Sequence, residues 1–413
     1  MGERIHASYW LETGDDPARA AEVIAGEQSS GPFVALPGET PELKARAGAR
    51  VERLELLETV AQPSLPVAKA SARYTRCVLE LSWPIENLGP SLPNLLATIA
   101  GNLFELRQVS GLRITGLRLP PSFAAAYPGP AFGIAGTRKL AGVEHGPLIG
   151  TIIKPSVGLS VAQTAAQVQQ LVDGGIDFIK DDELQADGPA CPFDQRVRAV
   201  MRVVRDAAER TGRKAMVAFN LTGELDQMKR RHDLVLAEGG TCVMASLNSI
   251  GLVGLTELRR HSQLPIHAHR NGWGYLTRCP ALGWDYAPWQ QIQRLAGADH
   301  LHVNGLANKF SESDESVIAA ARAVLAPLWN HAPMHAMPVF SSGQTGRQAR
   351  PTFDALGTAD LIHAAGGGIF GHPGGVAAGV TAMREAWNAA MAREPIEAAA
   401  CTRPALHAAL GFW

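Results

Sequence analysis

From about Leu148 onward, short apolar runs alternate with helical segments, and this pair of elements repeats eight times along the chain. The expected strands cover residues 149–153, 176–180, 214–219, 241–246, 264–268, 299–303, 337–341 and 360–365. The expected helices cover residues 161–172, 193–210, 224–237, 252–261, 286–296, 314–326, 352–357 and 374–391. Eight strand–helix units in about 245 residues match a TIM barrel in number and size. A doubly wound sheet is the alternative, but no GxGxxG turn follows the first strand.

The first 125 residues have a different order of elements. Strands are expected at 5–11, 51–57, 74–81 and 112–117, and helices at 17–25, with Asp16 as the cap, and at 92–106. The order β-α-β-β-α-β is the split βαβ arrangement of ferredoxin-like domains. The fold class expected is therefore α/β, with a smaller α+β domain before the TIM barrel. We place the α+β domain at 1–125, a linker at 126–147 and the catalytic barrel at 148–413.

Composition and charge exclude several classes of protein. The net charge of −1 over 413 residues gives no general attraction to nucleic acid or to anionic membranes. The five cysteines include no CxxC pair, which argues against a zinc site or a disulfide scaffold and fits a reducing compartment. No run of about 18 apolar residues is present, and the first residues lack the apolar core of a signal peptide. We therefore expect a cytoplasmic protein with no nucleic-acid or membrane partner.

The second expected strand of the barrel ends in an unusual run of charges, Lys180-Asp181-Asp182-Glu183. Active residues of TIM barrels lie at the carboxyl ends of the strands. A solvated turn is the ordinary interpretation of such a run. A cation site is the functional one, because Mg²⁺ binds a few carboxylates together with waters and substrate oxygens. An ammonium cannot bind a metal, whereas a lysine carbamylated by CO2 offers an oxygen ligand. This segment alone leaves both interpretations open.

Other strand ends also carry polar or glycine-rich groups. These groups are Lys154, His269, Arg270, His302, Ser341, Gly343, Gly366, Gly367 and Gly368, with Lys309 in the loop after the sixth strand. Each has an ordinary interpretation, such as a snorkelling lysine, a core histidine, an exposed loop lysine or a tight turn. The functional interpretation is a phosphate site, since guanidinium groups and glycine-rich backbone both bind phosphate, with a lysine that closes over the substrate.

Taken together, these motifs resemble the large chain of ribulose-bisphosphate carboxylase/oxygenase (Rubisco), and more closely the Rubisco-like proteins. The resemblance covers nearly the whole chain, and GGIDFIKDDE at 174–183 is its most specific part. It implies a carbamylated Lys180 that holds one Mg²⁺ together with Asp182 and Glu183. In GTIIKPSVGLS at 150–160, it implies that Lys154 transfers protons.

The resemblance also implies roles for residues elsewhere in the chain. His269 and Lys309 are expected to be catalytic. The residues expected to bind substrate or phosphate are Arg270, His302, Ser341, Gly343, Gly366, Gly367, Gly368, Asn102 and Glu27. In the family, the last two reach the active site of the partner subunit, so the resemblance implies a homodimer with shared active sites.

Several positions depart from the carboxylase pattern. Ser156 replaces a lysine, Trp273 replaces a histidine, and Ser342 replaces a glycine. In the N-terminal loop, Gly31-Pro32-Phe33 replaces Gly-Thr-Trp. The loss of a cation at Ser156, together with a bulky Trp273 at one end of the substrate, argues against CO2 fixation on ribulose bisphosphate. The residues needed to form an enolate are retained.

The stretch HRNGWGYLTR, at 269–278, resembles the Rubisco-like group associated with apiose catabolism. The function expected is decarboxylation or carbon–carbon cleavage of 3-oxo-isoapionate 4-phosphate through an enediolate. The alternatives are two methionine-salvage activities, an enolase acting on 2,3-diketo-5-methylthiopentyl 1-phosphate and a 5-methylthioribulose-1-phosphate isomerase. A non-catalytic protein that binds sugar phosphates is a further alternative, and it predicts the loss of metal ligands that are all present here.

Overall fold

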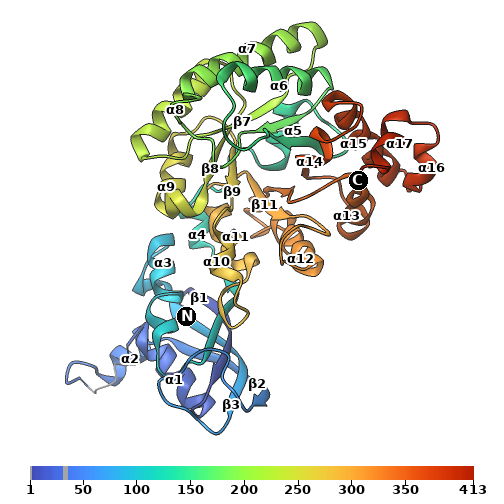
Figure 1. Cartoon of the computed structure of the whole chain (residues 1–413). Helices are drawn as coiled ribbons and strands as arrows, with labels where there is room; N and C mark the ends of the chain where they lie inside the picture. The colour runs from blue at the N-terminus through green and yellow to red at the C-terminus, as the bar shows by residue number, and fades with distance from the viewer. Residues whose placement is uncertain (1, 31–35) are drawn as a thin grey trace. The chain divides into compact units, whose positions relative to one another are not determined.

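The computed structural model describes residues 2–30 and 36–413. The chain divides into two compact units (Figure 1). The first contains Met1–Pro128 and Gly272–Leu295, and the second contains Gly129–Asn271 and Ala296–Trp413. Among the described residues, no helix has both the length and the apolar character needed to cross a membrane.

The first unit is built on a five-stranded sheet in the order β10-β4-β1-β3-β2. The strands are β1 (Arg4–Thr13), β2 (Arg50–Val60), β3 (Tyr74–Pro84), β4 (Gly111–Arg118) and β10 (Leu282–Trp284). The helices are α1 (Pro17–Glu27), α2 (Pro41–Ala47), η1 (Ile85–Asn87), α3 (Leu92–Ile99), η2 (Asn102–Glu105), α4 (Ser122–Ala126), α10 (Trp273–Thr277) and α11 (Tyr286–Leu295). Strands β1 to β4 pair antiparallel, as the ferredoxin-like pattern predicts.

The predicted helix over 92–106 is too long, because α3 ends at Ile99 and a separate short helix, η2, follows. The break falls at Gly101, where an added Cβ would lie only 2.3 Å from the carbonyl oxygen of Ala97. The chain therefore needs a glycine at this close approach, and glycine is a poor residue for continuing a helix.

One arginine of β4 makes several of the contacts that join the segment Gly272–Leu295 to this strand. The guanidinium of Arg113 donates to the carbonyl oxygens of Thr277, Cys279, Leu282 and Trp284, and it forms an ion pair with Asp285. β10 then runs parallel to β4 at the edge of the sheet. β10 is not predictable from the sequence, because a three-residue strand that contains a glycine gives no alternating pattern.

The second unit is a closed barrel of eight parallel strands with helices around it, which confirms the predicted fold class (Figure 1). The strands are β5 (Leu148–Ile152), β6 (Phe178–Lys180), β7 (Met216–Asn220), β8 (Cys242–Ser246), β9 (Ile266–His269), β11 (His300–Asn304), β12 (Met337–Phe340) and β13 (Ile362–Ala364). The helices are α5 (Gly133–Ala141), α6 (Val161–Asp173), α7 (Phe193–Thr211), α8 (Leu225–Ala237), α9 (Leu247–His261), α12 (Asp314–Leu325), η3 (Gly346–Gln348), α13 (Ala349–Leu356), α14 (Gly367–Phe370), α15 (Val376–Met391), α16 (Ile396–Ala400) and α17 (Pro404–Leu410).

The stretch predicted as a linker contains α5, which covers one end of the barrel interior. Ile134 of α5 packs against the apolar cluster inside the barrel, and Val143, just after α5, belongs to that cluster. The carboxylate of Asp299 accepts hydrogen bonds from the backbone N–H groups of Phe132 and Gly133, and its other oxygen lies 2.9 Å from Arg259. The glycines around α5 made this segment look like a loop in the sequence, whereas burial and this carboxylate cap stabilise a helix.

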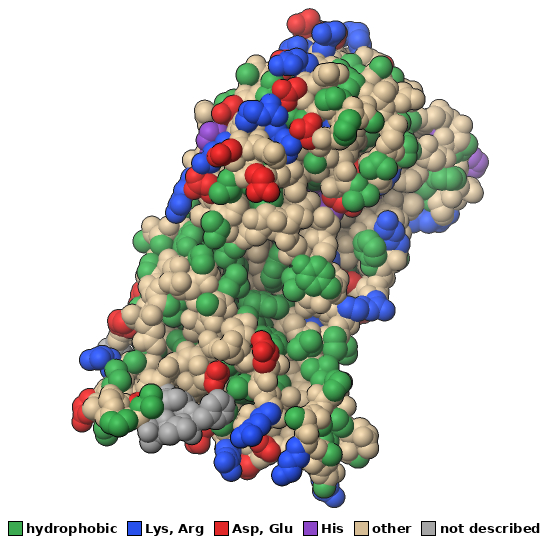
Figure 2. All heavy atoms as spheres, turned by 60° about the vertical axis from the view of Figure 1, so that its left-hand side comes forward, with side chains coloured by type: hydrophobic (Ala, Val, Ile, Leu, Met, Phe, Trp, Pro, Cys, Tyr) green, Lys and Arg blue, Asp and Glu red, His purple; other side chains and the backbone are tan. Residues whose placement is uncertain are grey.

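The outer surface of the barrel carries charges of both signs. Figure 2 shows basic and acidic side chains interspersed over the outer helices on the face in view. Ion pairs such as Arg230 with Asp194, at 2.9 Å, and Arg205 with Glu238, at 3.3 Å, join α7 to α8 or its C-terminal end. This face therefore presents no single basic stripe.

His363, in β13, is buried against the ring of Trp387 in α15, with ring centroids 5.4 Å apart. Burial lowers the pKa of this imidazole to about 4, below the usual value of about 6.5. The unfolded chain therefore takes up a proton at higher pH than the folded chain does. The stabilising effect of the neutral form is complete above about pH 6.5 and is lost as the pH falls toward 4.

We predict that His363→Phe lessens the loss of stability on acidification. Between pH 7.5 and pH 5, the free energy of unfolding should fall by about 2 kcal/mol less in the variant than in the wild type. Urea unfolding at the two pH values measures both losses. Equal losses in the two proteins would contradict the assignment of a neutral, buried His363.

Candidate active site at the carboxyl ends of the barrel strands

Lys180 is the last residue of β6, and its side chain is fully buried. It shares a strand face with Phe178, which packs inside the barrel against the ring of His267. The Nζ of Lys180 lies 3.3 Å from the Oε2 of Glu183. Burial lowers the pKa of the lysine, and the neighbouring carboxylates oppose this shift only in part.

The three acids after Lys180 face different partners. Asp181 accepts hydrogen bonds from the buried guanidinium of Arg196, at 3.1 Å, and from the backbone N–H of Asn220, at 2.9 Å. Asp182 instead accepts from the Nζ of Lys154, at 2.7 Å. Asp181 therefore anchors the loop to the barrel wall, whereas Asp182 and Glu183 face the lysines.

Lys154 brings the ends of β5, β6 and β13 together. Besides the Asp182 carboxylate, its ammonium contacts the hydroxyl of Ser156, at 2.8 Å. A Cβ added at Gly366 would lie 3.7 Å from the lysine Cε. Ser156, which replaces a family lysine, thus orients Lys154 in this structure.

His269 extends the site to the end of β9. Its Nε2 lies 3.4 Å from the Oε2 of Glu183, and its ring centroid lies 4.4 Å from that of His302. Burial, aided by the positive charge of Lys180, lowers the pKa of His269 to about 4, so the imidazole is neutral at neutral pH. Burial opposes ionisation of Glu183, yet the neighbouring cations lower its pKa to about 2. The cations near this carboxylate are His269, when protonated, and Lys180.

Arg270 has a carboxylate partner that the sequence does not reveal. It forms an ion pair with Glu312, whose Oε2 also accepts from the side-chain amide of Asn304, at 2.6 Å. A single acid in a polar loop gives no sequence signal of this kind. Any anion at Arg270 must therefore share the guanidinium with Glu312.

Lys309 is fixed at its backbone, where its N–H donates to the carbonyl oxygen of Ser342. Its side-chain Nζ lies 5.2 Å from the ring centroid of Phe310. Next to it, Gly343 adopts φ = +86°, where a Cβ would lie 3.6 Å from that of Lys309. The ends of β11 and β12 are thus in contact through this loop.

The hydroxyl of Ser341 meets the Nδ1 of His302, at 3.0 Å. In the glycine run after β13, a Cβ at Gly368 would lie 2.7 Å from the carbonyl oxygen of Gln344, so no side chain fits there. Gly367 begins the short helix α14. These residues complete the ring of predicted groups at the strand ends.

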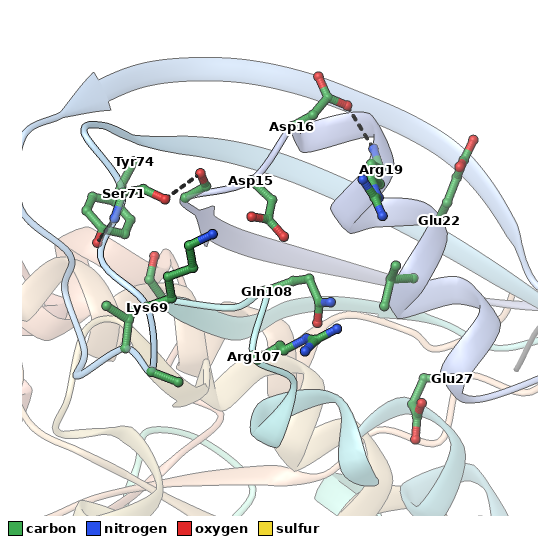
Figure 3. Close-up of a pocket in the computed structure, with 15 residues that line it drawn as sticks. Asp15, Asp16, Arg19, Glu22, Glu27, Lys69, Ser71, Tyr74, Arg107 and Gln108 are labelled. Carbon is green, nitrogen blue, oxygen red and sulfur yellow. Dashed lines mark hydrogen bonds between the residues drawn. The ribbon is translucent and has the colours of Figure 1, made fainter. Parts of the chain in front are cut away.

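Glu27 and Asn102 belong to the first unit. Glu27 ends α1 and lines a cavity of about 900 Å³ (Figure 3). Asn102 is an exposed residue at the start of η2. The walls of the cavity carry acids and bases alike, among them Asp15, Lys69 and Arg107. The roles predicted for Glu27 and Asn102 at a partner's active site stay predictions.

Trp273 is buried in an aromatic cluster of the first unit. Its ring centroid lies 5.2 Å from that of Tyr286 and 4.9 Å from that of Trp289. The structure therefore assigns Trp273 a packing contact, and a role at one end of the substrate stays a prediction. The other predicted departure, Gly31-Pro32-Phe33, lies outside the described residues.

The donor set around Lys180 fits a magnesium ion. The buried amine has a lowered pKa, which favours the neutral form that reacts with CO2 to give a carbamate. The carboxylates of Asp182 and Glu183 supply further hard oxygen donors. Asn220 fixes this loop, because its amide donates to the backbone carbonyl oxygens of Asp182 and Glu183, at 3.3 and 3.2 Å.

The fold and the site together define a class, the TIM-barrel enzymes with a lysine–carboxylate centre at the carboxyl end of the second barrel strand. Residues 133–413 match the catalytic domain of the ribulose bisphosphate carboxylase large chain, and residues 4–123 match its N-terminal domain. The chain belongs to this family, as a Rubisco-like protein. Enzymes of the family generally use Mg²⁺ with a carbamylated lysine.

Relatives match the chain over its whole length. A protein from Xanthobacter autotrophicus, named 3-oxo-isoapionate-4-phosphate transcarboxylase/hydrolase, is 73% identical over 100% of both chains. A 3-oxo-isoapionate-4-phosphate decarboxylase from Rhizobium etli is 43% identical over 98% of both. Among solved structures, a Rubisco-like protein from Burkholderia fungorum is 47% identical and covers 99% of this chain and 100% of its own, with a TM-score of 0.94.

Structural relatives in the family are oligomers. The Rubisco from Hyperthermus butylicus, described as dimeric, is 27% identical with a TM-score of 0.87, over 100% of this chain and 96% of its own. An octameric Rubisco from Pyrococcus horikoshii is 30% identical with a TM-score of 0.88, over 98% of this chain and 92% of its own.

We predict that substitution of Asp182 lowers turnover, whereas substitution of its neighbour Asp181 lowers stability. Asp182→Asn should lower turnover by more than about a hundredfold. Loss of a residue that supports a metal ligand costs up to about a hundredfold in activity, and loss of the ligand itself should cost at least as much. Its free energy of unfolding should change by no more than about 1 kcal/mol. Asp181→Asn should lower that free energy by about 3 kcal/mol, because it leaves the charge of Arg196 buried without its partner.

Urea unfolding and turnover of both variants, prepared side by side, give the comparison. Each variant is the control for the other, since the substitution is the same and the positions are adjacent. Normal turnover by Asp182→Asn would contradict the assignment of Asp182 as a metal ligand and Asp181 as a structural anchor.

Proposed function

We propose that this chain is an enzyme that acts on 3-oxo-isoapionate 4-phosphate. Its first step, of the carbon–carbon lyase type, breaks the carbon–carbon bond next to the carboxylate of the substrate. The observation that carries the proposal is the meeting of Lys154, Lys180, Asp182 and Glu183 at the ends of two adjacent strands, in a chain 73% identical to a protein named for this substrate. A 3-oxo acid loses CO2 readily once its ketone is polarised, because the electron pair of the broken bond is then stabilised as an enolate.

In this proposal, different strand ends bind the phosphate of the substrate and the metal ion. Arg270 and the glycine run Gly366–Gly368 hold the phosphate. The two ring nitrogens of His302 contact His267 and Ser341, so His302 acts on the substrate through Ser341. Carbamylated Lys180, Asp182 and Glu183 hold Mg²⁺, which when bound acts as a Lewis acid toward the substrate carbonyl. The neutral His269 beside Glu183 is an acceptor for a substrate hydroxyl.

Lys154 is the proton donor of the proposed reaction. Its ammonium is held between the Asp182 carboxylate and the Ser156 hydroxyl. The bond to the carboxylate carbon breaks, and its electron pair stays on the substrate as an enediolate. Where CO2 is released, the proton of Lys154 then goes to the carbon that lost it; where CO2 is transferred, the electron pair forms the new bond to CO2 at the other carbon of the enediolate. Lys309, on the loop after β11, closes the site and neutralises charge on the substrate.

Two fates of the carboxylate carbon follow from the names of the relatives. The decarboxylase of Rhizobium etli implies its release as CO2, and the transcarboxylase/hydrolase of Xanthobacter autotrophicus implies its transfer to another position. The higher identity, 73% against 43%, favours transfer in this chain. Both fates begin with the same bond cleavage.

We expect that 3-oxo-isoapionate 4-phosphate labelled with ¹³C in its carboxylate is consumed, and that the label appears in the carboxylate of a product. ¹³C NMR of the reaction mixture distinguishes this outcome from label in CO2 and bicarbonate, which would identify a decarboxylase. Lys180→Met should leave the substrate intact and is the control.

An unchanged substrate would contradict the proposal. If solvent deuterium instead entered 5-methylthioribulose 1-phosphate or 2,3-diketo-5-methylthiopentyl 1-phosphate, the methionine-salvage alternatives would replace it. Failure to turn over any of the three, with binding retained, would identify a non-catalytic sugar-phosphate-binding protein.

We further propose a homodimer in which Glu27 and Asn102 complete the partner's active site. The dimeric state described for the Hyperthermus butylicus enzyme supports this arrangement. Closed two-fold symmetry makes the two shared sites equivalent.

A further inference from the structure

Three buried histidines form a line through the barrel interior. His300 and His302 come from β11 and His267 from β9, and all three are almost wholly buried. The interior of a TIM barrel is normally filled by branched apolar side chains. The proposed reaction uses none of the three imidazoles directly, so they need a separate explanation.

The ring nitrogens join into an unbroken chain of contacts. The Oγ1 of Thr137, in α5, lies 2.8 Å from the Nε2 of His300. The Nδ1 of His300 lies 3.4 Å from the Nδ1 of His267, and the Nε2 of His267 lies 2.7 Å from the Nε2 of His302. The Nδ1 of His302 then lies 3.0 Å from the hydroxyl of Ser341.

Each of the three imidazoles is neutral at neutral pH. Burial lowers the pKa of His300 to about 3 and places those of His267 and His302 well below their ordinary value. A neutral imidazole has one N–H donor and one unprotonated nitrogen. Every contact in the chain therefore needs a donor on one side and an acceptor on the other, and the direction at one end determines all the others.

Thr137 sets that direction. Its hydroxyl donates to the carbonyl oxygen of Gly133, one turn earlier in α5. A hydroxyl has a single proton, so Oγ1 is left as an acceptor for the Nε2–H of His300. If Thr137 donated to His300 instead, its oxygen and that of Gly133 would face each other as two acceptors at close range.

We propose that Thr137 fixes the tautomers of the three histidines and thereby the orientation of the Ser341 hydroxyl. His300 carries its proton on Nε2, His267 on Nδ1 and His302 on Nε2. Ser341 then donates its proton inward, to the Nδ1 of His302, and presents its lone pairs outward.

The neighbouring hydroxyl does not disturb this arrangement. Ser342 donates to the Oδ1 of Asn304, at 2.8 Å, and its oxygen lies 3.4 Å from that of Ser341. Ser341 is thus an acceptor that selects a substrate hydroxyl and disfavours a phosphate oxygen. Thr137, His300 and His267 are positioning residues. The contact of Ser341 with substrate rests on the proposed function, whereas the tautomers do not.

The test is ¹⁵N NMR of the full-length protein labelled in its histidines, at pH 7.5, because the shifts of the two ring nitrogens report which one is protonated. Thr137→Val removes the hydroxyl at nearly constant volume, and Thr137→Ser retains it. We expect the stated tautomers in the wild type and in Thr137→Ser, and altered tautomers in Thr137→Val. The KM for 3-oxo-isoapionate 4-phosphate should rise about three- to tenfold in Thr137→Val with kcat nearly unchanged, the size expected for one neutral hydrogen bond.

The wild-type spectrum is decisive even if Thr137→Val fails to fold. A proton on the Nδ1 of His302, or a doubly protonated ring among the three, would overturn the proposal. So would wild-type tautomers in a folded Thr137→Val. Altered tautomers with an unchanged KM would overturn the selective role of Ser341. A protein inactive on this substrate would leave the NMR result decisive and count only against the proposed function.

Discussion

The contact between the buried amine of Lys180 and the carboxylate of Glu183 is the interaction on which the rest of the site depends. Removing a charged amine from water is costly, and burial lowers the pKa of this lysine despite the acids beside it. The balance favours a lysine that loses its proton readily, as reaction with CO2 requires. His269, when protonated, and the charge of Lys180 together lower the pKa of Glu183 to about 2.

Neighbouring contacts hold this arrangement in place. Asp181 points away from the site to the buried Arg196, and the amide of Asn220 binds the backbone carbonyl oxygens of the two residues that follow Asp181. Of the three acids at this strand end, Asp181 therefore anchors the loop, and Asp182 and Glu183 are left at the candidate site. Asp182 and Glu183 face the cation site, and the contacts of Asp181 and Asn220 hold the loop that carries them.

The repeating pattern of strands and helices predicted the barrel well, because each unit buries one face of a helix on a strand of regular length. It failed where elements are short and rich in glycine. α5 looked like part of a linker, and β10 gave no pattern at all. Both are stabilised by partners distant in sequence, Asp299 for α5 and Arg113 for the segment that contains β10.

The candidate site was predictable in its residues but not in its contacts. The motif around Lys180 and its resemblance to a known family named the groups that the barrel brings together. The ion pair of Arg270 with Glu312 and the contacts of His300 with His267 and Thr137 depend on the geometry of distant segments. Only a three-dimensional structure could reveal them.

The most direct test of this account is ¹³C NMR of the protein with ¹³C-bicarbonate and Mg²⁺, compared with the same experiment on Lys180→Met. The account predicts a carbamate resonance that grows with Mg²⁺ in the wild type and is missing from the variant. A wild-type protein that turns over substrate fully in CO2-free buffer, with no carbamate resonance, would contradict it.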